Sequence, residues 1–406
     1  MSKNNNIANK RLEDLLAFSL GIMHGEDGNK LIEKHKDAID NITPQDMLNL
    51  ENKQMQMGIS PADIKKDVEK VINVFFKSLE KYQWDKPKEG SFLYYLMLEN
   101  EAYTFKLNQI KKILKSYKGR EKEEFKQLKH DLLPKFQELK PFDNHYIKKE
   151  NILFPYLEKI WNSYRPLSVM WSLHDDIRKS LKQLIAMLED ENSDWDKFNK
   201  RLGKFFSLSF RMIQKENMIV FPVATETVDN EIWGEMHEQS FEYPFPFIEA
   251  PKKPKKDKSS SKVQIKPIEK AGQIISETGA MSVDQALMVF NHLPVDITVV
   301  DENDKVLFFN RPDERFFPRS PAIIGRSVQN CHPPESVHVV EKIIEAFKKG
   351  EKDKAEFWIQ MQGKFILIKY FALRNDDGEY KGVLEVGQEI TDIKKLEGER
   401  RLLDWE

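Results

Sequence analysis

The chain has almost no cysteine. Cys331 is its single cysteine in 406 residues, which excludes an internal disulfide framework and is typical of proteins in a reducing cytoplasm. The N-terminal stretch MSKNNNIANKRLEDLL lacks the uninterrupted apolar segment of a secretory signal peptide, and no apolar run approaches the length of a transmembrane helix. We therefore expect a cytoplasmic protein without a membrane span.

The chain also lacks an excess of charge of either sign. Lys and Arg number 64 and Asp and Glu number 66, for a formal net charge of −2, so neither nucleic acid nor an anionic membrane is expected as a partner. The sequence contains no Walker loop, no Gly-x-Gly-x-x-Gly, no Cys-x-x-Cys and no Gly-x-Ser-x-Gly. With 40% hydrophobic and 32% charged residues, the composition is that of a globular protein, and the length predicts two or three domains.

Helical periodicity dominates the first 245 residues. Residues 1–80 predict a small helical domain, in which Thr43 caps a helix that starts at Pro44; its expected role is docking or packing. Residues 85–245 predict an up-down four-helix bundle, because long apolar patterns of helical period alternate with short polar joints. These patterns cover approximately residues 92–115, 121–159, 166–190 and 195–220.

The periodicity changes after residues 250–270, a Lys-, Pro- and Ser-rich stretch that cannot bury a core and predicts a flexible linker. Residues 280–406 predict an antiparallel sheet with helices on one side. The expected elements are two strands within 296–310, a helix at 334–349, a hairpin at 356–371, a strand at 383–390 and a charged helical tail at 393–406. The fold class predicted for the chain is multidomain, mainly α plus α+β.

Two nearly identical segments lie on the second and fourth predicted bundle helices. HYIKKENILFP runs from His145 to Pro155, and MIQKENMIVFP runs from Met212 to Pro222, an offset of 67 residues when both are aligned on Phe-Pro. A repeat on alternate helices indicates an internally duplicated helix pair.

These segments carry a family resemblance. HYIKKENILFP, VMWSLHDDIR and KENMIVFP resemble the hemerythrin-like (HHE) cation-binding bundle, whereas ITVVDENDKVLFFN, IIGRSVQNCHPPE and GVLEVGQEITDIKKLE resemble a PAS domain. The whole chain resembles a bacterial family in which a small helical N-terminal domain, a hemerythrin-like bundle and a PAS domain follow one another. The resemblance implies a sensor of oxygen, redox state or metal, with a PAS sheet that cups a small ligand or cofactor.

The resemblance also implies a metal site. A His-x-x-x-Glu pair points two ligands the same way, since residues i and i+4 differ by about 40° around a helix. The first copy keeps His145 but has Lys149 at i+4, and the second keeps Glu216 but has Met212 in place of histidine. The candidate ligands are therefore His145, His174 and Glu216, with Tyr94 as a fourth. They suit one iron or other single metal ion; in the alternative, the site has degenerated and Lys149 forms an ion pair with Glu216.

The loop before the predicted helix at 334–349 gathers Cys331, His332 and His338. We expect these residues to bind a cofactor, with His332 or Cys331 as an axial ligand of haem, or to contact a small ligand in its place. Cys331 is also a candidate redox-reactive thiol. Alternatively, His332 only anchors the helix that follows Pro333.

Three functions are consistent with these residues. The first is a sensor of oxygen, redox state, metal or haem that acts through the bundle and the PAS domain. The second is a ligand-free interaction adaptor with a degenerate metal site. A metal-dependent oxidase or peroxide scavenger is the third, and the missing ligands disfavour it. In each case but the last, the signal is expected to leave through a protein partner or a homo-oligomer.

Overall fold

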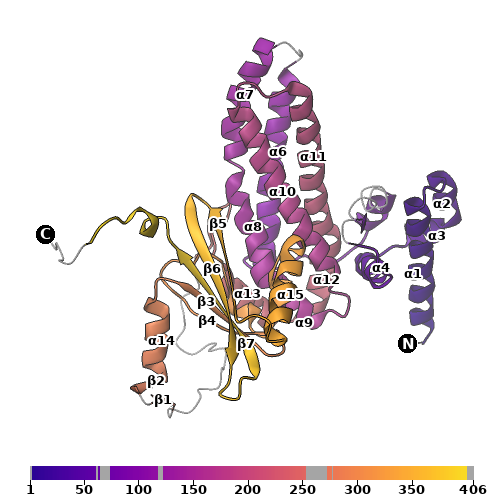
Figure 1. Ribbon diagram of the computed structural model, residues 1–406. Helices are drawn as coiled ribbons and strands as arrows, with labels where there is room; N and C mark the ends of the chain where they lie inside the picture. Colours follow the sequence, from indigo (N-terminus) through magenta and orange to yellow (C-terminus); the bar gives the residue numbers. More distant parts are fainter. Residues whose placement is uncertain are drawn as a thin grey trace. The chain divides into compact units, whose positions relative to one another are not determined.

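The computed structural model describes residues 2–60, 63–64, 74–117, 122–252, 272–276 and 278–399. The chain forms two compact units, Met1–Lys253 and Pro254–Glu406, whose elements are labelled in Figure 1. Among the described residues, no helix combines the length and apolarity needed to cross a membrane. Most of the predicted linker at 250–270 and the last residues of the predicted tail lie outside the described residues.

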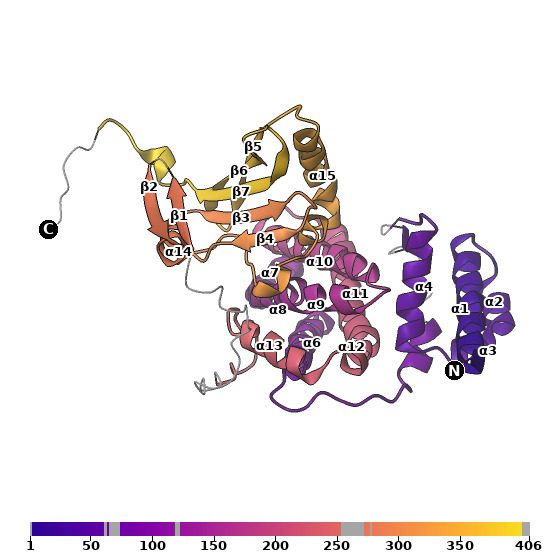
Figure 2. The ribbon, with the colours of Figure 1, turned by 90° about the horizontal axis from the view of Figure 1, so that it is seen from below.

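The first unit begins with a group of short helices that pack on the long helix α1 (Figure 2). They are α1 (Ser2–Met23), α2 (Gly28–Lys34), α3 (Lys36–Asp40) and α4 (Pro44–Gln56). The predicted cap of α4 is present: the Asp46 amide donates to Thr43 Oγ1 at 3.2 Å, and the Thr43 amide donates to Asp46 Oδ2 at 2.9 Å. This capping box fixes the start of α4. Glu51 of this helix contacts Lys215 of the bundle, the residue before Glu216.

The bundle follows, and its long helices lie alongside one another in Figure 1. The second predicted bundle helix is interrupted at Pro141, where a 3-10 turn, Lys140–Phe142, separates α7 from α8. The elements are α6 (Phe92–Ser116), α7 (Lys122–Gln137), α8 (Asp143–Lys148), α9 (Phe154–Ile160), α10 (Pro166–Glu189), α11 (Trp195–Lys215), α12 (Phe221–Thr227) and α13 (Asn230–Ser240). Each predicted bundle helix is therefore present, two of them assembled from consecutive segments.

Both repeat segments contain a π-helical turn at the same place. Lys149–Leu153 (η2) joins α8 to α9, and Glu216–Val220 (η3) joins α11 to α12. A π turn holds one more residue than an α turn, so the side chains after it are rotated relative to those before it. The structural repeat therefore follows the sequence repeat, and neither turn was predicted.

The second unit contains an antiparallel sheet of five strands in the order β4-β3-β7-β6-β5. Gln362 and Gly363 have positive φ values, 51° and 81°, and form the predicted turn of the β5–β6 hairpin. The elements are β1 (Gln273–Ser276), β2 (Gly279–Ser282), α14 (Val283–His292), β3 (Asp296–Asp301), β4 (Val306–Phe309), α15 (Pro334–Lys348), β5 (Lys354–Met361), β6 (Lys364–Arg374) and β7 (Tyr380–Glu389).

Helix α15 covers one face of this sheet. Its side chains Val340, Ile344 and Phe347 share a buried cluster with Val300 of β3, Val383 of β7 and residues of β6. The face is not apolar throughout, because the register places Thr298, Glu385 and Tyr370 in one row across β3, β7 and β6. All three are buried.

The described part of the predicted helical tail differs from the prediction. From residue 393 the described chain forms a single 3-10 turn, Ile393–Lys395, and then continues without helix to residue 399. Ile393 and Leu396 are exposed, so these described residues have no packed apolar face that would stabilise a short helix.

Candidate functional sites

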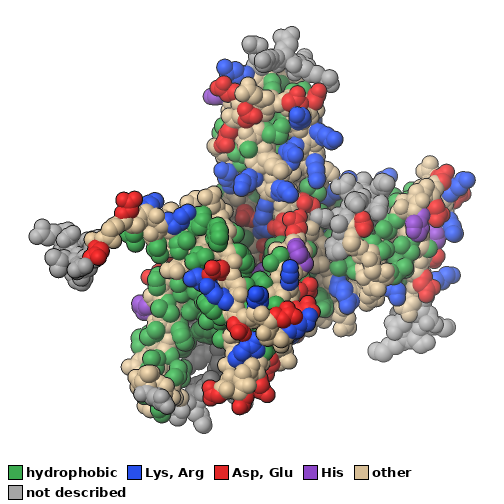
Figure 3. Space-filling model, viewed as in Figure 1, with side chains coloured by type: hydrophobic (Ala, Val, Ile, Leu, Met, Phe, Trp, Pro, Cys, Tyr) green, Lys and Arg blue, Asp and Glu red, His purple; other side chains and the backbone are tan. Residues whose placement is uncertain are grey.

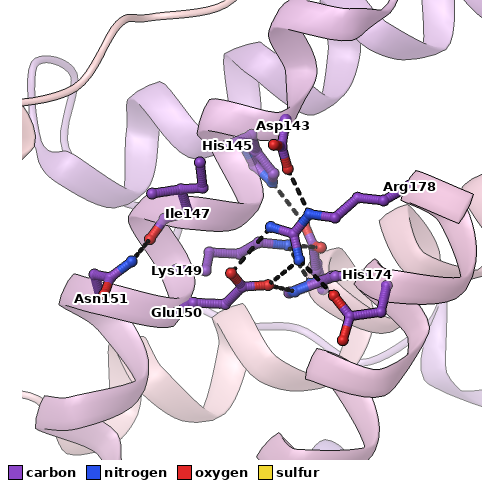
Figure 4. Close-up of polar contacts among 10 residues, drawn as sticks. Asp143, His145, Ile147, Lys149, Glu150, Asn151, His174 and Arg178 are labelled. Carbon is purple, nitrogen blue, oxygen red and sulfur yellow. Dashed lines mark hydrogen bonds and ion pairs between the residues drawn. The ribbon is translucent and has the colours of Figure 1, made fainter. Parts of the chain in front are cut away.

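At the centre of the bundle, a lysine occupies the position where the predicted metal ligands converge. Lys149 Nζ donates to Glu216 Oε1 and lies 3.2 Å from His174 Nε2. All three residues are completely buried, and Figure 4 shows Lys149 and His174 pointing toward one another from different helices. The ion pair between Lys149 and Glu216 expected for a degenerate site is therefore present.

His145 connects this ion pair to α6. Its Nε2 lies 3.0 Å from Glu216 Oε2, and its Nδ1 lies 2.7 Å from Glu99 Oε2. Glu99 also accepts from Lys148 Nζ, which lies 4.2 Å from the centre of the Phe245 ring. His145 thus lies between two buried carboxylates, Glu99 and Glu216, and each carboxylate also accepts from a buried lysine. Each buried charge therefore has an opposite charge beside it.

A second acid–base group completes the network. Glu150 Oε1 accepts from His174 Nδ1 at 2.7 Å, and the Arg178 guanidinium donates to both Glu150 oxygens at 2.9 and 3.0 Å. Arg178 also donates to Asp143 (Figure 4) and to Asp175. Because Nδ1 of His174 donates to a carboxylate and Nε2 accepts from an ammonium, this imidazole is held in one neutral tautomer.

The electrostatics agree with this arrangement. Burial lowers the pKa of His174 well below its ordinary value, and the Lys149 ammonium and Arg178 guanidinium lower it further. Burial alone would raise the pKa of Glu216, but the charges of Lys149 and His145 hold it well below its usual range. Burial lowers the pKa of Lys149, and Glu216 opposes this effect. The network is thus a set of fixed charges around a neutral histidine.

These residues do not fit a metal ion. The donor atoms of His174 and Glu216 that would face a metal are directed at the Lys149 ammonium, which carries the charge a metal would supply. In the described ranges, no group of three or more His, Cys, Asp or Glu side chains is arranged to hold a metal ion. His145, His174 and Glu216 are brought together as the sequence suggested, but around a lysine.

Tyr94 does not join them. It lies in the first turn of α6, where its amide donates to Ser91 Oγ and its ring packs edge-on against Tyr95. The residues that α6 contributes are Glu99 and Asn100, whose Nδ2 donates to Glu216 Oε2 at 2.8 Å. Tyr94 and Glu99 are five positions apart and differ by about 140° around the helix, so they cannot both face the centre.

Sequence reasoning missed Glu99, Lys148, Glu150 and Arg178 as members of the network. One signal was available for Glu99: its dipeptide Glu99-Asn100 matches the Glu-Asn of both repeat segments. Nothing comparable identified Arg178, whose role depends on where Glu150 points within the π turn Lys149–Leu153.

The second unit contains another buried polar group. Asp296 starts β3 and accepts from the amides of Phe316 and Phe317 through Oδ2, at 2.8 and 3.0 Å. Its other oxygen, Oδ1, is buried and, among the described residues, has no hydrogen-bond partner; the same is true of Arg319 Nε. Burial raises the pKa of Asp296, and Arg315 and Arg319 oppose this effect.

Tyr370 and Glu385 lie beside this group on the covered face of the sheet, as direct cross-strand neighbours. Burial raises the pKa of Tyr370, and the Glu385 carboxylate, to which its hydroxyl is bonded, raises it further, while Arg319 opposes them. Arg319 therefore acts electrostatically on both Asp296 and Tyr370.

The three predicted cofactor-binding residues lie at the start of α15. Cys331 Sγ donates to the carbonyl oxygen of Ser327 at 3.6 Å, and His338 is exposed in the second turn of α15. Burial lowers the pKa of His332 to about 4, and the charges of Arg319 and Arg326 lower it further. His332 is therefore a neutral imidazole near physiological pH, next to two cations that the sequence did not predict there.

Comparisons with known proteins cover both units. The family model described as the hemerythrin HHE cation binding domain matches residues 92–224, and the PAS domain model matches residues 287–391. No curated protein matches the chain.

Among solved structures, the C-terminal domain of a Streptococcus mutans protein is 36% identical, with a TM-score of 0.30, over 32% of this chain and 100% of that one. A PAS domain from Colwellia psychrerythraea is 21% identical, with a TM-score of 0.23, over 27% and 97% of the two chains. The PAS domain of Bordetella pertussis BvgS is 15% identical, with a TM-score of 0.23, over 28% and 88%.

Proposed function

This chain carries a hemerythrin HHE cation-binding domain followed by a PAS domain, and from this combination we propose that it is a sensory protein whose PAS domain binds a small polar ligand. The bundle is an unsuitable receptor for oxygen or metal, because Lys149 contacts the side chains that would hold a metal ion. The PAS unit is therefore the part of the chain that receives the signal.

The observation that carries this proposal is the pair of unsatisfied polar atoms in the PAS interior. A buried acceptor or donor without a partner costs about 1–3 kcal/mol, and Asp296 Oδ1 and Arg319 Nε are such atoms among the described residues. A ligand with a donor for Asp296 and an acceptor for Arg319 would offset both costs. A small zwitterionic or amide-bearing molecule has this chemistry.

His332 supports haem as a second candidate. A neutral imidazole is the form that ligates iron, and the low pKa of His332 keeps it neutral. The charges of Arg319 and Arg326 act on the same ring. In this second candidate they would pair with the carboxylates of a bound porphyrin.

Two measurements on the purified full-length chain test the proposal. The absorption spectrum is recorded with and without oxygen, and small molecules released by denaturation are identified by mass spectrometry. We expect a stoichiometric polar molecule that Asp296→Asn loses and that the exposed control Glu302→Gln retains. A haem band lost in His332→Ala would favour the second candidate. A folded chain that retains no molecule, and that cellular extracts do not stabilise, would favour the ligand-free adaptor.

The output of the sensor passes, in this proposal, to a second copy of the chain or another protein in the cytoplasm. Hydrophobic side chains gather on the PAS unit around α14 (Figure 3). Leu287, Met288, Val289 and Phe290 are consecutive in α14 and all exposed, and such a patch favours association. Light scattering of Met288→Glu beside the wild type tests this, with self-association of the wild type and its loss in the variant expected.

A further inference from the structure

The two repeat segments place a lysine and a glutamate at equivalent positions. With both segments aligned on Phe-Pro, Lys149 corresponds to Glu216 and Lys148 to Lys215, each 67 residues apart. Lys149 and Glu216 are also the first residues of the two π turns. Sequence and backbone therefore agree that these two positions are the same position in the two halves of the bundle.

These equivalent positions face one another. Lys149 Nζ donates to Glu216 Oε1, so the residue at this position in one half contacts its counterpart in the other. If both positions held glutamate, two buried carboxylates would meet, and their repulsion would require a bound cation or a proton. With lysine at one of them, the chain supplies the positive charge itself.

The surroundings are those of a cation site. His174 Nε2 lies 3.2 Å from Lys149 Nζ, and His145 Nε2 lies 3.0 Å from Glu216 Oε2. Imidazole nitrogen and carboxylate oxygen are the ligands preferred by Zn²⁺, Mn²⁺ and Fe²⁺. Metal–nitrogen bonds are about 2.0–2.1 Å long, so a metal at the position of the ammonium requires the ligands to move inward by about 1 Å.

We propose that the Lys149 ammonium replaces a divalent metal ion in this bundle, and that the substitution Lys149→Glu creates a metal site there. The substitution changes the local charge by two units, which one divalent ion offsets. The ligands would be His145, His174, Glu216 and the introduced carboxylate. This inference goes beyond the proposed sensory function and does not depend on a PAS ligand.

The test is metal binding by full-length chains. Wild type and variants are incubated anaerobically with Fe²⁺, Mn²⁺ or Zn²⁺ and desalted, and bound metal is measured beside thermal unfolding. We expect no retained ion in wild type and one per chain in Lys149→Glu, whose Tm the metal raises by about 5 °C. Adding His174→Ala to Lys149→Glu should abolish the binding.

Lys215→Glu is the matched control. Lys215 is the repeat equivalent of Lys148 and is likewise a buried lysine, paired with Glu51. Among the described residues, its ammonium donates to the two Glu51 oxygens and to no histidine. This variant should be destabilised and gain no metal. Lys149→Gln, which removes the charge with less repulsion, should bind one ion more weakly and covers the case in which Lys149→Glu fails to fold. Metal in the wild-type bundle, or folded Lys149→Glu and Lys149→Gln chains that both bind none, would overturn the proposal.

Discussion

Lys215 and Glu51 form a buried ion pair between α11 and α4, in which Lys215 Nζ donates to both carboxylate oxygens at 2.7 Å. The pair joins the N-terminal helices to the bundle one residue before Glu216. Asn52, the next residue of α4, lies within 3.5 Å of Ser163, so α4 contacts the bundle through polar as well as apolar groups.

Glu51→Gln should destabilise the first unit by about 3 kcal/mol, because it leaves a buried ammonium without its anion. Urea unfolding followed by far-UV circular dichroism measures the change. The exposed control Glu33→Gln should change stability by less than about 0.5 kcal/mol. Replacing both partners, with Glu51→Leu and Lys215→Met, should recover most of the loss; a double variant as unstable as Glu51→Gln would contradict this account.

His332 makes the stability of the PAS unit depend on pH. Its pKa is about 4 in the folded chain and ordinarily 6.5, so between these values the unfolded state binds the extra proton. Stability is therefore fully present above about pH 6.5 and falls as the pH drops toward 4, by up to about 1.4 kcal/mol per pH unit. Hydrogen exchange of peptides from β6 and β7 measures it, and His332→Gln should flatten the profile. An unchanged slope in that variant would assign the dependence to other groups.

Gly382 has no room for a side chain. Its φ is +141°, and a Cβ there would lie 2.1 Å from the carbonyl oxygen of Val300 on the neighbouring strand. Gly382→Ala should destabilise the sheet by about 3 kcal/mol or more. Gly363→Ala is the matched control, since its φ is +81° but nothing lies near its Cβ position, and about 1 kcal/mol is expected. Thermal unfolding of both variants compares them, and equal losses would show that the contact with Val300 is unimportant.

Asp296 fixes the loop that follows β4. It accepts from the amides of Phe316 and Phe317, and Asp296→Ala should cost about 2–3 kcal/mol by leaving both donors unpaired. Asp296→Asn keeps one acceptor oxygen and should cost clearly less. The comparison is made by denaturant unfolding of the full chain; equal losses for the two variants would mean that the carboxylate charge matters more than the hydrogen bonds.

The sequence predicted the elements well and the site in part, for one physical reason. Apolar periodicity records which face of a helix or strand is buried, so the bundle helices and the hairpin across Gln362 and Gly363 could be predicted. The partners of buried charges depend on side-chain direction across several helices, which no periodicity records. The Lys149–Glu216 pair could be predicted because the repeat aligned these two positions. Arg178 and Arg319 could not, because their partners lie across loops and turns.

Tyr94 and the C-terminal tail show the same limit. Tyr94 lies on the helix segment in which the family resemblance places a ligand, yet a rotation of about 140° around α6 separates it from Glu99. The tail was expected to be helical, but from residue 393 to residue 399 the chain forms only a 3-10 turn, in which no apolar contact buries Ile393 or Leu396.

The π turns at Lys149 and Glu216 have a consequence for how the bundle tolerates change in length. Each accommodates one additional residue, and that residue turns everything downstream by about 100°. Phe154 and Phe221, which directly follow the two turns, reach the interior in this setting. Deleting a single amino acid from either turn would rotate the phenylalanine that follows it toward solvent. A one-residue irregularity therefore determines which face of each helix is buried.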